Sequence, residues 1–251
     1  MSPTKVVVTG FGVRPLFVSA RGRVRLTSQQ SFLDIITNPS WEIARRLPSS
    51  TTGINGELIE IVVPSEPTPV AYHRILAQVT QLIEEHAPKL MVHIGLDVDS
   101  PPGVFELERS APKEGYHDIP DVDRRVFTRA ENKKLFGKAH ASLQTTLDID
   151  AAVETWRGAC ADLTLSRPHA GARKGKKVDK QGVEVRLSDN VGTYVCGFQY
   201  YVSMLEAQKR SGARDVVFLH VPRLDGEEEV AVGVKVVEEL IRALVGFFST
   251  K

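Results

Sequence analysis

The sequence predicts an α/β fold: a three-layer α/β/α sandwich with a mainly parallel central sheet. Short apolar runs alternate with helical stretches along the chain, which is the pattern that βαβ units produce. In such sheets the strands are covered by helices on both faces, so their apolar runs are short and buried. A chain of 251 residues can bury a sizeable core, and we expect one domain over residues 1–251.

In the N-terminal half, strands are predicted from short apolar runs that stop at a glycine or a proline: Val6–Thr9, Leu58–Val63 and Leu90–Ile94. Helices are predicted over residues 39–47 and over Tyr72–His86. The first has Asn38 as a favourable N-cap and Pro39 in its first turn, where proline is tolerated. The second has apolar residues at helical spacing.

The C-terminal half continues the alternation. Strands are predicted at Val183–Leu187 and Asp215–Val221, and helices at Asp150–Trp156, Tyr194–Lys209 and Val230–Phe248. Gly212 lies just beyond the helix that ends at Lys209, where glycine commonly terminates a helix.

Two stretches interrupt this pattern, and we expect both to be insertions: residues 14–37 and residues 166–182. The second is polar, rich in glycine and basic, which is typical of a solvated surface loop. Contact with an anion or a nucleic acid is the alternative, but no aromatic residue lies between the basic ones to stack on bases.

Composition excludes several classes of protein. With 32 basic and 31 acidic residues, the net charge of +1 gives no global attraction to nucleic acid or to an anionic membrane. Two cysteines cannot form a disulfide-rich secreted scaffold. No apolar run approaches the roughly 18–20 residues that span a bilayer, and the N-terminus has no signal-peptide pattern. We therefore expect a cytoplasmic protein with free thiols that binds neither nucleic acid nor membrane.

The common local motifs are absent. Gly10 and Gly12 follow a strand, but the dinucleotide fingerprint needs a third glycine where this chain has Pro15. The sequence contains no Walker loop, no G-x-S-x-G elbow and no H-E-x-x-H motif. Its histidines are scattered and no C-x-x-C pair is present, so we expect neither a metal nor another cofactor.

Cys196 and His220 are the candidate reactive pair. Cys196 lies at the expected start of a helix, where free N–H groups and the helix dipole stabilise a thiolate. His220 ends a strand 24 residues later, and a helix–turn–strand unit of that length returns the chain to the same edge of the sheet. The two side chains could therefore meet as nucleophile and acid/base.

The residues alone also allow a structural interpretation of this pair. A lone cysteine in a helix is more often a small buried hydrophobe, and a lone histidine at a strand end is usually structural. Cys160 has neither a helix start nor a matching histidine, and we expect it to be structural.

Short segments spread over nearly the whole chain match one known family in its own order. They are Val6–Gly12, Asn38–Glu42, Pro69–Tyr72, Val92–Gly95, Leu107–Arg109, Gly115–Tyr116, Tyr194–Tyr201 and Phe218–Pro222. Together they resemble the pyroglutamyl peptidase I (pyrrolidone-carboxylate peptidase) family. The resemblance implies an α/β/α sandwich and a cytosolic cysteine peptidase that removes N-terminal pyroglutamate from peptides without a metal.

The resemblance also implies roles for individual residues. Cys196 would be the nucleophile that forms a thioester, His220 the acid/base, and Glu108 the carboxylate that orients the imidazole. Glu106 would share a strand face with Glu108 and is the alternative carboxylate.

The substrate slot is expected at the first loop of the chain. The resemblance places Phe11 and, with the inserted residues looped out, Phe17 against the lactam ring, and Leu96 lies in the segment that should border it. This loop departs from the family pattern, because Asn38 follows only after the 14–37 insertion. Two alternatives therefore stay open: an amidase of the same scaffold with another N-terminal specificity, or a non-catalytic binding protein that uses its basic loop.

The oligomeric state stays open as well. The aromatic pairs Tyr200–Tyr201 and Phe247–Phe248 fit either a core or an interface between copies in a homo-oligomer. The physiological peptide is equally unspecified by the sequence.

Overall fold

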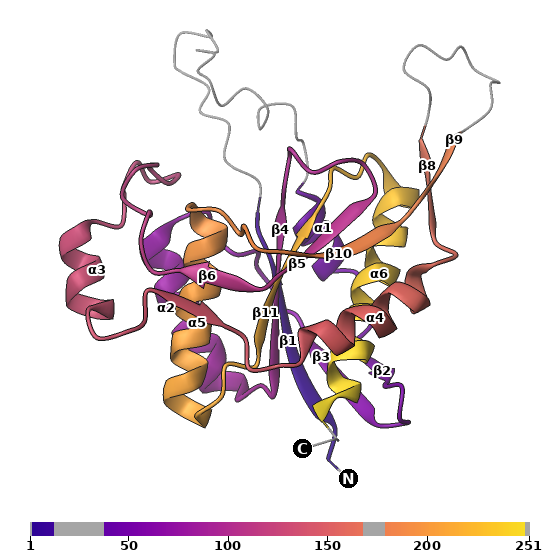
Figure 1. Cartoon of the computed structure of the whole chain (residues 1–251), viewed down its shortest axis with the longest axis horizontal. Coiled ribbons are helices and arrows are strands. Elements are labelled where there is room, and N and C mark those ends of the chain that lie inside the picture. The colour runs from indigo at the N-terminus through magenta and orange to yellow at the C-terminus, as the bar shows by residue number, and fades with distance from the viewer. Residues whose placement is uncertain (1, 13–37, 168–178, 249–251) are drawn as a thin grey trace, which may run out of the picture.

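A computed structural model of the chain describes residues 2–12, 38–167 and 179–248. At its centre is a seven-stranded sheet with the strand order β10-β5-β11-β4-β1-β3-β2. In chain order these strands are β1 (Thr4–Gly10), β2 (Ser50–Thr52), β3 (Leu58–Val62), β4 (Leu90–Leu96), β5 (Val104–Glu108), β10 (Glu184–Ser188) and β11 (Val216–Val221). Most neighbouring strands are parallel, and helices cover both faces (Figure 1). The predicted α/β fold is confirmed.

The helices fall into two layers that bury separate apolar clusters. The helices α1 (Pro39–Ala44), α4 (Ile149–Cys160) and α6 (Glu227–Gly246) pack on one face, seen on the right in Figure 1. The helices α2 (Tyr72–His86) and α5 (Val195–Ser211) pack on the other, together with Phe136 of α3 (Arg129–Phe136). Because successive side chains of a strand point to opposite faces, β1 gives Val6 and Val8 to the first cluster and Val7 to the second.

Two strand pairs depart from the expected parallel order. Strand β5 runs antiparallel to β11, and β2 runs antiparallel to β3. Neither β2 nor β5 is among the strands predicted from apolar runs. Both are short, and the topology of the sheet, not a local sequence pattern, decides which strand each of them pairs with. The position of β5 matters most, since it brings the end of that strand beside Phe218 and His220 of β11.

Several predicted elements have shifted ends. The helix predicted over residues 39–47 ends at Ala44, and the helix predicted from Val230 begins at Glu227, where three glutamates meet the positive end of the helix dipole. The helix predicted at Asp150–Trp156 extends over Ile149–Cys160. The helix at Tyr72–His86 has the predicted bounds.

The two expected insertions lie largely outside the described residues. The whole of the 14–37 segment lies outside them. The ends of the 166–182 segment belong to a two-stranded antiparallel ladder of β8 (Thr164–Arg167) and β9 (Asp179–Gly182). A second small ladder joins β6 (Ser110–Pro112) and β7 (Ser142–Gln144). No helix in the described ranges is both long and apolar enough to cross a membrane.

Candidate active site

The register of β4, β11 and β5 determines which residues lie side by side at the base of the candidate site. On β11, His220 is opposite Gly95 of β4 and Glu106 of β5. Two residues earlier on the same face, Phe218 is opposite His93 and Glu108. The helix α5 crosses this face of the sheet, and its first turn carries Cys196.

The structure brings the three predicted catalytic side chains together. The Cys196 thiol is hydrogen-bonded to the His220 imidazole. On the other side of the ring, Nδ1 of His220 lies 2.7 Å from Oε1 of Glu108. The carboxylate is almost fully buried and the histidine nearly so, while Cys196 is half-buried. A continuous chain of hydrogen bonds therefore runs from the sulfur to a buried carboxylate.

The two glutamates left open by the sequence have different partners. Glu108 contacts His220, whereas Oε1 of Glu106 pairs with the guanidinium of Arg186 at 2.8 Å. Strand β5 places both on one face. The register sets Glu106 opposite His220, yet the Glu106 carboxylate pairs with Arg186, and it is Glu108 that contacts Nδ1.

His220 is held in its protonated form. Burial lowers the pKa of the imidazole, but the hydrogen bonds and charges of Cys196 and Glu108 outweigh burial and raise it to about 10. An imidazolium between a sulfur and a carboxylate can stabilise negative charge on the sulfur and hold a proton ready for transfer.

Gly95 makes room for the sulfur. A Cβ at this position would lie 2.7 Å from the ring of Phe218 and 3.1 Å from Sγ of Cys196. Phe218 in turn packs against His220 in a tilted arrangement, with ring centroids 5.0 Å apart and an interplanar angle of 59°. The sulfur thus lies against the backbone of β4, and the Phe218 ring packs beside the imidazole on the same face of the sheet.

Backbone N–H groups are available beside the sulfur. The N–H of Phe198 makes the first intrahelical bond of α5, to the carbonyl of Tyr194. The N–H groups of Val195, Cys196 and Gly197 precede it and have no carbonyl one turn earlier in the helix. They lie at the positive end of the helix dipole, which favours negative charge.

Helix α5 also holds the strand that carries Glu108. The Tyr200 hydroxyl donates a hydrogen bond of 3.2 Å to the backbone carbonyl of Glu108. Tyr200 lies one turn after Cys196, so one helix fixes both the nucleophile candidate and its distant carboxylate.

The structure describes two of the three predicted substrate-binding residues, Phe11 and Leu96. Phe11 follows the end of β1, and continuing the β1–β4 register brings it opposite Gly95 on the face of Cys196. Its side chain is buried in the α2/α5 cluster, and its backbone N–H donates to the Ser40 hydroxyl. Leu96 ends β4 and is half-buried. Phe17 lies outside the described residues.

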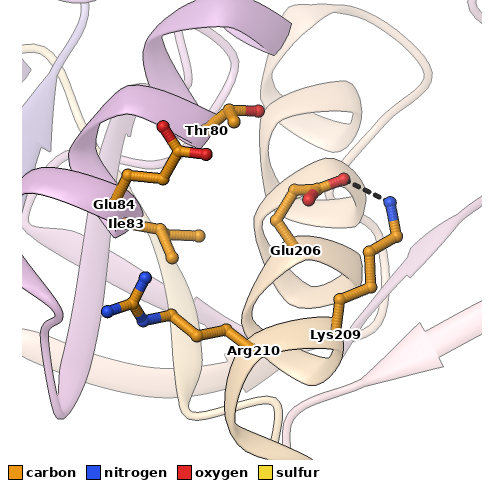
Figure 2. A pocket seen from close by; sticks show the side chains of 6 residues that line it. All are labelled: Thr80, Ile83, Glu84, Glu206, Lys209 and Arg210. Atoms are coloured by element: carbon orange, nitrogen blue, oxygen red, sulfur yellow. Dashed lines mark hydrogen bonds and ion pairs between the residues drawn. The ribbon is translucent and has the colours of Figure 1, made fainter.

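Other features of the described residues offer less chemistry. No group of three or more His, Cys, Asp or Glu among them could hold a metal ion. A hollow of about 170 Å³ lies between α2 and α5 (Figure 2), lined by Thr80, Ile83, Glu84, Glu206, Lys209 and Arg210. Its α5 residues are about 15–20 Å along the helix from Cys196, at 1.5 Å per residue, so it is not part of the candidate site.

Gly95, Phe218 and Tyr200 are parts of the site to which the sequence alone assigned no role. Gly95 follows a predicted strand and ends one of the segments that match the family, and a glycine beside the carboxyl end of a buried strand is a signal of close approach. Phe218 and Tyr200 also lie in matching segments, but their contacts depend on register and on helix docking, which no local pattern specifies.

Known pyroglutamyl peptidases are similar to this chain over most of its length. A family model described as pyroglutamyl peptidase matches residues 172–236, a range that includes Cys196 and His220. Pyrrolidone-carboxylate peptidases of Bacillus anthracis and Bacillus cereus are 25% identical over 210 residues, covering 80% of this chain and 78% of theirs.

Two solved structures have the same fold at low identity. The pyrrolidone carboxyl peptidase from Thermococcus litoralis has a TM-score of 0.64 at 18% identity, covering 98% of this chain and 96% of its own. The pyroglutamyl peptidase I from Bacillus amyloliquefaciens has a TM-score of 0.63 at 19% identity, covering 97% of this chain and 96% of its own.

Proposed function

From its similarity to the pyroglutamyl peptidases, a family of cysteine omega peptidases, we propose that this chain belongs to that family and removes N-terminal pyroglutamate from peptides. The observation that carries the proposal is the hydrogen-bonded series of three side chains: Cys196 at the start of α5, His220 on β11 and Glu108 on β5. Nucleophile, acid/base and orienting carboxylate follow one another in the order that acyl transfer requires.

In the first step, Sγ of Cys196 attacks the carbonyl that joins pyroglutamate to the next residue. The carbonyl oxygen becomes an oxyanion and accepts hydrogen bonds from N–H groups of the first turn of α5. The C–N bond then breaks, and His220 gives its proton to the departing amine, which leaves a thioester on Cys196.

In the second step, water hydrolyses the thioester. His220 takes a proton from the water, whose oxygen attacks the thioester carbonyl, and the C–S bond breaks to release pyroglutamate. The negative sulfur is one source of the raised pKa of His220. Acylation removes that source, so the pKa falls and the imidazole becomes a better base when a base is needed.

The lactam ring is proposed to lie on the Phe11 side of Cys196. Phe11 is one strand from Gly95 on the same face, and Leu96 follows Gly95 along β4. We extend the proposal to Phe17, which lies outside the described residues. A pyroglutamyl ring carries no charged amine, and an apolar slot of this kind suits it.

Turnover of a pyroglutamyl-coumarin amide tests the proposal. We expect hydrolysis by the wild type, loss of hydrolysis in Cys196→Ala, and retained hydrolysis in Cys160→Ala, the matched control. If the wild type leaves this amide intact but hydrolyses another blocked N-terminal amide, and this activity needs Cys196, then that other blocking group and not pyroglutamate is the substrate. Inactivity towards every amide would contradict a peptidase.

We also propose that residues 1–251 form one domain that acts in the cytoplasm. The free thiols of Cys160 and Cys196 support a reducing compartment. Cell fractionation with a compartment marker tests the location, and a single cooperative unfolding transition tests the domain count.

A further inference from the structure

A buried chain of polar side chains lies below the candidate site. Nε2 of Gln199 donates to Oγ1 of Thr9 at 3.2 Å and to Oγ1 of Thr68 at 3.4 Å. Oγ1 of Thr9 also lies 2.7 Å from Nδ1 of His93. All four side chains are at most 1% exposed. Polar groups are expensive to bury, and an apolar filling would serve packing alone at least as well.

The hydrogen-bond directions within this chain follow from its donors. Gln199 supplies the N–H groups, so Thr9 and Thr68 accept. The Thr9 hydroxyl accepts from Gln199 and still has its own proton to donate. Its other contact among the described residues is Nδ1 of His93, which therefore accepts that proton. His93 then carries its proton on Nε2, and full burial lowers the pKa of its imidazole to about 3, which keeps the ring neutral.

The chain joins the nucleophile helix to the backbone around Phe11. Gln199 lies three residues after Cys196, about one helical turn. Thr9 precedes Phe11 by two residues, and Thr68 holds both sides of it: the Thr68 N–H donates to the Gly10 carbonyl, and the Thr68 carbonyl accepts from the Gly12 N–H. A single carboxamide therefore connects the helix that bears the sulfur with the Phe11 segment and with the Thr68 segment beside it.

We propose that Gln199 is a positioning residue that fixes the start of α5, and with it Cys196, relative to the Phe11 segment. Resting on the proposed function, this assigns Gln199 the task of aligning the scissile carbonyl with the sulfur. Misplacement of a reacting group by about 1 Å costs on the order of a hundredfold in rate. The described hydrogen bonds of Gln199 go to Thr9 and Thr68 and not to the sulfur or His220, so we expect the intrinsic reactivity of the thiol not to depend on it.

The first experiment compares turnover with alkylation in a Cys160→Ala background. Gln199→Leu should lower kcat/KM for a pyroglutamyl amide by about ten- to a hundredfold, while the rate and pH dependence of Cys196 alkylation by iodoacetamide stay unchanged. Thr9→Val should lower turnover in the same way, and Thr9→Ser, which keeps the hydroxyl, should restore most of it.

Ser203→Ala is the matched control. Ser203 lies one turn further along α5, is fully buried, and its hydroxyl has no hydrogen-bond partner among the described residues. Its removal should leave turnover and alkylation at wild-type values. Equal losses in Ser203→Ala and Gln199→Leu, or a parallel fall of alkylation and turnover in Gln199→Leu, would overturn the positioning role.

Amide hydrogen exchange separates this inference from the proposed function. Gln199→Leu should speed exchange of the Gly12 and Thr68 N–H groups and leave the N–H groups of β11 unchanged, whether or not the protein is active. Unchanged exchange at Gly12 and Thr68 would overturn the inference. A wild type that is inactive on pyroglutamyl amides while the exchange shifts as expected would refute only the proposed function.

Discussion

Replacing Glu108 with glutamine removes one negative charge and keeps the shape of the side chain. In the wild type, Oε1 of Glu108 lies 2.7 Å from Nδ1 of His220 in a site that excludes water. Glutamine can still present an oxygen to Nδ1. What it removes is the charge that favours the protonated imidazole.

The size of the effect follows from this one contact. A hydrogen bond to a charged group contributes about 1.5–3 kcal/mol. At 1.36 kcal/mol per pKa unit, the pKa of His220 should fall by about one to two units from its raised value of about 10. Oε2 of Glu108 has no partner among the described residues, so the glutamine amide also buries a donor without an acceptor, which costs about 1–3 kcal/mol of folding free energy.

Nitrogen NMR of the imidazole, titrated with pH, measures the shift without requiring turnover. Glu106→Gln is the matched control, since Glu106 lies two residues away on the same strand face and pairs with Arg186 instead of His220. The urea midpoint of each variant shows whether it is folded. An unchanged His220 pKa in folded Glu108→Gln, or an equal shift in Glu106→Gln, would refute the reasoning.

Three further outcomes are expected. Gly95→Ala places a methyl group against Phe218 and Sγ of Cys196, so turnover should fall by about tenfold or more in steady-state assays; wild-type rates would show that the sulfur does not occupy this position. Iodoacetamide should modify Cys196 and spare Cys160, which is buried and whose thiol pKa burial raises to about 12; peptide mass spectrometry measures this, and equal labelling would contradict it. The folded-state pKa of His220, about 10, lies above the ordinary value of 6.5 for an imidazole, so its contribution to the free energy of unfolding is complete below pH 6.5 and is lost as the pH rises through about 10; urea unfolding should show a larger alkaline loss of stability in wild type than in His220→Asn, and equal losses would argue against the raised pKa.

Local sequence pattern was sufficient for the elements that bury one clear face. Helix α2 has its predicted bounds because apolar residues recur at helical spacing from Tyr72 to His86. Helix α5 was predicted to within one residue of its start, which is why Cys196 could be assigned to a first turn. Strand β11 likewise begins one residue after its predicted start.

Register and pairing could not be predicted from such patterns. The contact of Glu108 with His220 depends on β5 entering the sheet antiparallel to β11, a pairing between residues more than a hundred positions apart. The resemblance to a family supplied Glu108 where spacing alone could not. The small helix α3 did carry a usable signal, since Thr128 and Glu131 form a capping box at its start.

The pairing of β5 with β11 also constrains how this chain can vary in length. Side chains along a strand alternate between faces, so one residue inserted or deleted within Val104–Glu108 would turn Glu108 away from His220. An insertion would bring Leu107 to the imidazole in its place, and a deletion would bring Arg109. The connection from Asp97 to Gly103 carries no such parity and can lengthen without disturbing the strand. Variants of this chain, natural or engineered, should therefore tolerate insertions between Asp97 and Gly103 but not within Val104–Glu108.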